Sequence, residues 1–187
     1  MKLVNLFLLS IVMLWFTGCA VTSDHMTAVH KPLSPERNEA SIVFIRASNY
    51  GAAVQATIYD GKEYIGTVSG MTKVAYHTEP GEHMFMVIGE SADFMQATLE
   101  AGKTYYAQIV PRPGVWKARF SFRPINDVAG ETRLQQWIAK TTMVEPNEKG
   151  YEWAKANAES ITEKHDAYLP KWQEKDRKQI LEASSGR

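Results

Sequence analysis

The sequence predicts an α+β fold, with an antiparallel β-sandwich-like domain of seven or eight short strands over residues 41–124 and a helical C-terminal extension over residues 125–187. Two patterns predict it. Between residues 41 and 124, short runs rich in β-branched and aromatic residues alternate with turn signals. Beyond residue 125, apolar residues recur at steps of three and four, which is the period of a helix. A chain of 187 residues, 44% of them hydrophobic, suits one such domain.

The strands are expected where β-like runs end at turn residues. Asp60-Gly61 predicts a tight type I′ hairpin turn, which needs positive φ at both residues. Pro80-Gly81 and Ala101-Gly102 mark two further turns. The expected strands are Ser41–Ala47, Ala53–Tyr59, Lys62–Val68, Thr72–Thr78, Glu82–Gly89, Phe94–Leu99, Thr104–Val110 and Val115–Arg123.

Two of these strands carry clear orientation signals. The run from Met84 to Ile88 is apolar on both faces, which is typical of a central strand covered on both sides. In Val115–Arg123 the two faces differ, so one is expected in a core and the other in solvent. The core face holds Trp116, Ala118, Phe120 and Phe122, and the opposite face holds Lys117, Arg119, Ser121 and Arg123.

The C-terminal extension is expected to hold a short helix over Thr132–Lys140 and a long one over Asn147–Ala183. Pro170 should kink or split the long helix, because proline lacks an N–H donor and its ring clashes with the preceding turn. We expect the part before Pro170 to cover the open face of the sheet and the charged part after it to be exposed. The alternative is an amphipathic helix that docks a partner or a second copy. The apolar stripe consists of Ala154, Ala158, Ile161, His165, Tyr168 and Trp172.

The first nineteen residues have the pattern of a secretory signal. Lys2 precedes an apolar run, Leu3–Phe16, that is too short to span a bilayer, and small residues then lead to Cys19, the only cysteine. The stretch Phe16-Thr17-Gly18-Cys19 resembles a lipobox. It predicts a lipoprotein signal peptide over residues 1–18 and a lipid on Cys19, with an ordinary signal peptide or an uncleaved anchor as the alternative.

Two further expectations follow from the segment after the cysteine. Ala20, rather than an aspartate, follows Cys19 and indicates an outer-membrane destination. Residues 19–40 show little apolar periodicity and include Pro32 and Pro35, so we expect a flexible tether between the lipid and the domain.

Several short motifs recur at the expected strand ends. They are Val43-Phe44-Ile45-Arg46, Tyr59-Asp60-Gly61 with Ile65-Gly66, Pro80-Gly81-Glu82-His83, and Ala101-Gly102-Lys103-Thr104-Tyr105-Tyr106. This series resembles a bacterial domain-of-unknown-function family of small β-rich lipoproteins, related in style to the β-sandwich PEGA modules. The resemblance covers about residues 41–110. It implies a fold and an envelope location, and it implies no activity.

Three residues are candidates for a metal site. His77, Glu79 and His83 are residue types that zinc accepts, and a hairpin at Pro80-Gly81 would bring the two histidines together. Their spacing differs from that of a helical metalloprotease motif. We therefore favour ordinary polar roles at the strand ends.

Basic and aromatic residues supply two weaker candidates. Lys117, Arg119 and Arg123, helped by Arg112, would meet the phosphates of lipid or lipopolysaccharide, although solvated charges that prevent sheet-to-sheet pairing explain them equally well. Aromatic residues would line a stacking groove for a sugar, but aromatic residues are also good strand formers, and we expect Tyr105 and Trp116 in the core. The aromatic candidates are Tyr64, Tyr76, Tyr105, Tyr106 and Trp116.

Charge and motifs narrow the function. Lys+Arg and Asp+Glu both number 21, so nucleic acid is not an expected partner, and no pattern for a cofactor or for catalysis stands out. We expect a non-enzymatic protein of the bacterial cell envelope, anchored by lipid to the outer membrane and facing the periplasm, that acts as a structural or protein-binding module for another envelope protein. The alternatives are a glycan- or lipid-binding lipoprotein and a metal-dependent hydrolase using His77, Glu79 and His83.

Overall fold

The computed structural model describes residues 23–116, 118–127 and 131–187. No helix in these ranges is both long and apolar enough to cross a membrane. The strands are β1 (Met26–Ala28), β2 (Ala40–Arg46), β3 (Ala56–Asp60), β4 (Glu63–Val68), β5 (Thr72–Thr78), β6 (Gly81–Ile88), β7 (Ala92–Leu99), β8 (Thr104–Arg112), β9 (Arg119–Pro124), β10 (Thr142–Pro146) and β11 (Ile180–Leu181). The helices are α1 (Leu134–Lys140), α2 (Glu148–Ala156), α3 (Ala158–Gln173) and a short 3-10 helix (Ala183–Ser185).

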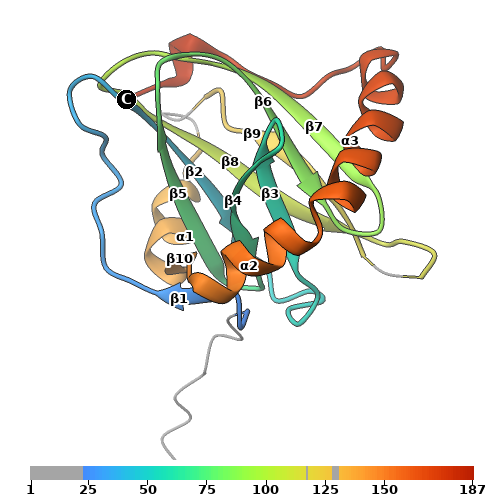
Figure 1. The fold of residues 1–187 in the computed structure, drawn as a ribbon. Coiled ribbons are helices and arrows are strands. Elements are labelled where there is room, and N and C mark those ends of the chain that lie inside the picture. The colour runs from blue at the N-terminus through green and yellow to red at the C-terminus, as the bar shows by residue number, and fades with distance from the viewer. Residues whose placement is uncertain (1–22, 117, 128–130) are drawn as a thin grey trace, which may run out of the picture.

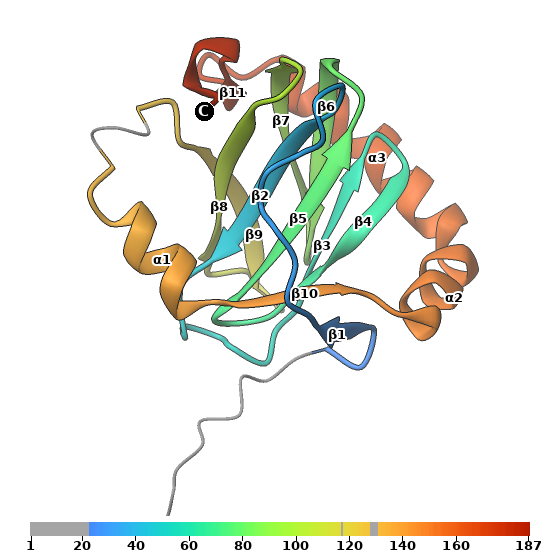
Figure 2. The same ribbon diagram turned by 90° about the vertical axis from the view of Figure 1, so that its left-hand side faces the viewer.

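The strands form two sheets that pack face to face (Figure 1 and Figure 2). The six-stranded sheet has the order β1-β10-β5-β2-β8-β9, and the five-stranded sheet has the order β11-β7-β6-β3-β4. This arrangement confirms the predicted α+β sandwich-like class. The pairs β2–β8, β5–β10 and β7–β11 are parallel, so the sheets are mixed, whereas the sequence predicted antiparallel pairing.

The main core lies between the two sheets. Phe44 of β2 and Phe85 of β6 meet there edge to face, with ring centroids 5.2 Å apart. Each strand is also apolar on its other face, where Ile45 of β2 and Met86 of β6 are fully buried. Strands buried on both faces need cover on both sides. The prediction that Met84–Ile88 forms such a central strand is confirmed.

Helices supply the cover on the two outer faces. Leu134 of α1 packs on the outer face of the six-stranded sheet. Ile161 and Trp172 of α3 pack on the outer face of the five-stranded sheet, against a cluster that includes Met86 and Phe94. Figure 2 shows α1 on one side of the sandwich and α2 and α3 on the other. The predicted covering role of the tail is confirmed, although Ala158 is exposed.

The eight expected strands are all present, and all but β5 have one or both ends shifted. β3 begins at Ala56 and β9 at Arg119, each later than predicted, because loops occupy the residues before them. At the Asp60-Gly61 turn only Gly61 has a positive φ, of 55°, so the turn is not the type I′ pair that was predicted. Strands β1, β10 and β11 were not predicted, because runs of two to five residues give too short a pattern to recognise.

The expectation of a flexible tether is wrong for residues 23–40. Strand β1 pairs with β10, and Met26 is buried against Val74 and Gly66. Val29 and Leu33 pack on the cluster under α1. The steps of three and four between Met26, Val29 and Leu33 lack the alternation of a strand, so no strand was expected here, yet all three side chains pack on the core clusters. Residues 19–22, with Cys19, lie outside the described residues.

The tail also differs from the prediction around Pro170. The helical run breaks at Asn157 between α2 and α3, whereas Pro170 lies inside the last part of α3. Most residues after Pro170 are exposed, as predicted, but Trp172 and Leu181 are buried. The indole Nε1 of Trp172 donates to Gln179 at 2.8 Å. Burial of this large ring stabilises the final turn and offsets the hydrogen bond that proline cannot make.

The covering contact can be tested at Trp172, which is 2% exposed and lies 6.3 Å from the ring of Phe94. Trp172→Ala should lower the free energy of unfolding by ~3–5 kcal/mol, as for other buried aromatic truncations. Trp116→Ala is the matched control, because Trp116 is 90% exposed, and it should change stability by less than about 0.5 kcal/mol. Urea unfolding measures both. Equal losses in the two variants would contradict the covering role.

Candidate functional site

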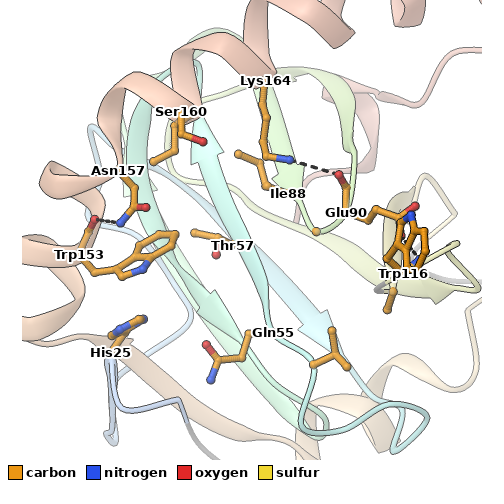
Figure 3. Close-up of a pocket in the computed structure, with 14 residues that line it drawn as sticks. His25, Gln55, Thr57, Ile88, Glu90, Trp116, Trp153, Asn157, Ser160 and Lys164 are labelled. Carbon is orange, nitrogen blue, oxygen red and sulfur yellow. Dashed lines mark hydrogen bonds between the residues drawn. The ribbon is translucent and has the colours of Figure 1, made fainter.

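A groove of about 580 Å³ opens beside α2 and α3, on the outer face of the five-stranded sheet (Figure 3). Its floor is formed by Thr57 of β3 and Ile88 of β6, which lie directly opposite each other in the β3–β6 pair. Tyr59 and Met86 form the pair two positions further along the same strands, and α3 covers them. The groove is therefore the part of this sheet face that the helices leave open.

The helical wall presents Trp153, Asn157, Ser160 and Lys164 toward the groove (Figure 3). Their spacing of four, three and four places them on one side of the α2–α3 run. Asn157 forms the joint between the helices, and its side-chain Nδ2 donates to the carbonyl of Trp153 at 2.8 Å. The wall carries an aromatic ring, an amide, a hydroxyl and an ammonium group in a row.

The N-terminal segment holds this wall in place. The imidazole of His25 stacks on the indole of Trp153, with centroids 5.3 Å apart and planes at 28°. The carbonyl of His25 accepts the backbone N–H of Asn147 at 3.1 Å. Gly150 allows α2 to approach closely, since a Cβ there would lie 2.4 Å from that carbonyl oxygen. The indole of Trp153 is thus held by the stacked imidazole of His25 as well as by its own position in α2.

Glu90 organises the far end of the groove. Its carboxylate accepts the backbone N–H groups of Val115 at 3.1 Å and Trp116 at 2.6 Å, and it pairs with Arg119 at 2.7 Å. These contacts fix the loop between β8 and β9, so Trp116 stands out at the end of the groove. The carbonyl of Glu90 accepts the ammonium of Lys164 at 3.2 Å.

Arg46 organises the loop between β2 and β3, which forms the third side. The guanidinium is buried and donates to the carbonyls of Tyr50 at 3.2 Å, Gly51 at 2.7 Å and Val54. It also lies 4.9 Å from the ring centroid of Phe120. Burial lowers the pKa of Arg46 to about 10, so the group stays charged at neutral pH. Its hydrogen bonds set the position of Val54 at the groove.

The sequence-predicted metal candidates do not form one site. His83 Nδ1 lies 2.6 Å from Asp60 Oδ2, and Nε2 lies 2.9 Å from the carbonyl of Glu79. His77 belongs to the six-stranded sheet, whereas His83 belongs to the five-stranded sheet. The turn at Pro80-Gly81 therefore leads from one sheet to the other, and the expected hairpin is wrong. Within the described ranges no three potential ligands gather as a metal site would need.

Two of the basic candidates, Arg119 and Arg123, form ion pairs with carboxylates. Arg119 pairs with Glu90, and Arg123 pairs with Glu131 at 2.6 Å. Lys117 lies outside the described residues, and Arg112 is exposed at the end of β8. These ion pairs favour the edge-charge interpretation. Contact with an anionic surface stays a prediction.

The aromatic candidates are dispersed, and only Trp116 lines the groove. Tyr105 is fully buried in the main core, as predicted, but the core position expected for Trp116 is wrong, because β9 begins three residues after it. The remaining three are half-buried: Tyr64 beside α2, Tyr76 edge-on to Phe85, and Tyr106 against the cluster under α1.

Sequence reasoning missed the helical wall. The row of Trp153, Asn157, Ser160 and Lys164 lies one residue before the first four members of the predicted apolar stripe. The spacing of this row was the signal in the sequence that could have revealed the helical wall. It was overlooked because polar residues beside an apolar stripe normally face solvent.

Comparisons of the chain with protein-family models, with curated proteins and with solved structures give no match. The resemblance to β-rich envelope lipoproteins therefore stays a prediction of the sequence.

The pair of His83 and Asp60 predicts a pH dependence. The hydrogen bond that the His83 imidazole donates to the carboxylate of Asp60 is the main cause that raises the pKa of His83 above 6.5. A raised folded-state pKa contributes stability that is complete below about pH 6.5 and is lost as the pH rises through the folded value. The free energy of unfolding of wild type minus that of Asp60→Asn should therefore shrink from about pH 6 to about pH 9. A difference that stays constant over this range would contradict the pairing.

The role of Arg46 can be tested by removing its donors. Arg46→Gln should cost ~3 kcal/mol or more, because it leaves buried carbonyl groups without partners. Amide exchange in residues 49–55 should accelerate as the loop loosens. Arg112→Gln, at an exposed arginine, is the control and should change stability by less than about 0.5 kcal/mol. Unchanged exchange in residues 49–55 of Arg46→Gln would show that another interaction holds the loop.

Proposed function

We propose that this protein is a non-enzymatic, lipid-anchored binding protein of the bacterial outer membrane, facing the periplasm, and that its groove binds a carbohydrate chain. The observation that carries this proposal is the immobilised indole of Trp153 beside a row of neutral polar side chains. His25 stacks on this indole at 5.3 Å, so little side-chain freedom is left to lose on binding.

The chemistry of the groove matches that of a sugar. A sugar ring has an apolar C–H face, which packs on an aromatic ring, and a rim of hydroxyl groups, which need donors and acceptors. Gln55, Thr57, Asn157 and Ser160 supply amide and hydroxyl groups around Trp153 (Figure 3). The volume of about 580 Å³ lies within the range of small-ligand sites, ~300–1,000 Å³.

The charges in the groove favour an acidic glycan. The carboxylate of Glu90 is paired with Arg119, whereas the ammonium of Lys164 donates to a neutral carbonyl. Since a carbonyl does not neutralise an ammonium, a carboxylate on the ligand would gain a charge-assisted hydrogen bond at Lys164. Peptidoglycan fragments combine N-acetylated sugars with carboxylates and are suitable probes.

The groove also supports a binding role over a hydrolytic one. Glycoside hydrolysis ordinarily uses two carboxyl groups on either side of the scissile bond. Among the described residues that line the groove, Glu90 carries the only carboxylate, and backbone N–H groups donate to it. The protein-binding role expected from the sequence stays a prediction. If the groove bound a protein instead of a carbohydrate, the titration below would show no binding of the carbohydrate probes.

Titration with soluble peptidoglycan fragments tests the proposal. Trp153→Ala should weaken binding at least tenfold, ~1.4 kcal/mol, while Trp137→Ala on α1 should not weaken it. Lys164→Gln should weaken binding of these acidic fragments and leave binding of neutral chitotetraose unchanged. Calorimetry measures the affinities, and circular dichroism checks the fold of each variant. Equal affinities of wild type and Trp153→Ala would overturn the carbohydrate proposal.

A further inference from the structure

We infer that the folded domain lies directly on the bilayer and docks there through the apolar tips of two loops. These loop tips are Tyr50 and Val54 between β2 and β3, and Val115 and Trp116 between β8 and β9. The inference rests on the proposed lipid anchor at Cys19. It adds an interaction surface whose partner is the lipid surface itself.

The first step is the length of the chain between the anchor and the domain. Ser23 is buried, its hydroxyl donates to Gln55 at 3.0 Å, and it accepts the N–H of His25 at 3.2 Å. Four Cα–Cα steps separate Cys19 from Ser23 in the sequence, and each spans about 3.8 Å. The buried Ser23 therefore lies within ~15 Å of the lipid-bearing residue. A domain held this closely turns the end that carries Ser23 toward the membrane.

The second step is what surrounds Ser23. Its partner Gln55 directly follows Val54 on the loop that Arg46 holds. Figure 1 shows this loop at the end of the molecule where the described chain begins. On it Tyr50 is 62% exposed and Val54 is 36% exposed. Residues 47–55 contain no Asp, Glu, Lys or Arg, so no charge has to leave water when the tip meets the lipid.

The third step is the neighbouring loop. Val115 is 72% exposed and Trp116 is 90% exposed, and Trp116 lines the same groove as Val54 and Gln55. Six large hydrophobic side chains are exposed in the described residues, and four of them lie on these two loops. Tryptophan and tyrosine are the residues that favour the bilayer interface, because their rings are apolar with one polar group. The loop tips therefore suit the interface beside the acyl chains.

The test uses the lipidated protein purified from bacterial membranes and reconstituted in vesicles of phosphatidylethanolamine and phosphatidylglycerol with brominated acyl chains. Bromine quenches tryptophan fluorescence at close range. We expect quenching in wild type and at least a twofold smaller fractional loss in Trp116→Phe, which removes the reporter and keeps an aromatic ring. Tyr50→Glu should also reduce quenching, whereas Ile180→Glu, at an exposed apolar residue on β11, should not.

Mass spectrometry of the same samples shows whether Cys19 carries lipid, and it therefore separates failure of the anchor from failure of the docking. If Cys19 carries lipid and quenching is equal in wild type and Trp116→Phe, the docking is overturned while the anchor stands. If Cys19 carries no lipid, the anchor is overturned, and the docking falls with it. Groove binding is measured independently of both.

Discussion

The burial of the outer face of the five-stranded sheet under α3 is the interaction on which the other features depend. Strands β3, β6 and β7 are apolar on both sides, so a sandwich of two sheets alone would leave Met86 and Phe94 in water. Ile161 and Trp172 supply the missing cover. Ile88 packs at the margin of this cluster and Thr57 lies outside it, and both line the groove. The groove therefore lies where the helices leave the face of the sheet uncovered.

The two ends of the chain complete this arrangement. Near the N-terminal end of the described chain, β1 pairs with β10, and His25 accepts the backbone N–H of Asn147 at the start of α2 and stacks on Trp153. At the C-terminus, β11 pairs with β7, and Lys175 bonds to the buried Asp93 at 2.6 Å. His25, the third residue of the described chain, thus also lines the groove. In the proposed account, the residues that follow the lipid anchor also hold the fold together and line the groove, so the groove opens close to the membrane.

Much of the fold could be predicted because local patterns report it. Thr72–Thr78 matches β5 at both ends, since its strand residues stop at clear turn signals. The run in β6 that is apolar on both faces also predicted that another element covers its outer face, and α3 does so. Arg46, by contrast, is an isolated basic residue at a strand end in sequence, and only the folded chain brings three loop carbonyls around it. Trp153 was missed for the same reason, since its role depends on His25, which is distant in the chain and lies in a segment without periodic pattern.

The central claim is that the opening beside α2 and α3 is the binding site, and the indole N–H signals of the protein test it most directly. Trp153 lines the groove, whereas Trp137 lies on α1 over the other sheet and Trp172, on α3, is buried against the five-stranded sheet. In an NMR titration with soluble peptidoglycan fragments, the account predicts that the Trp153 indole signal shifts with saturation while the Trp137 and Trp172 signals stay in place. A saturating shift at Trp137 with Trp153 unmoved would contradict it.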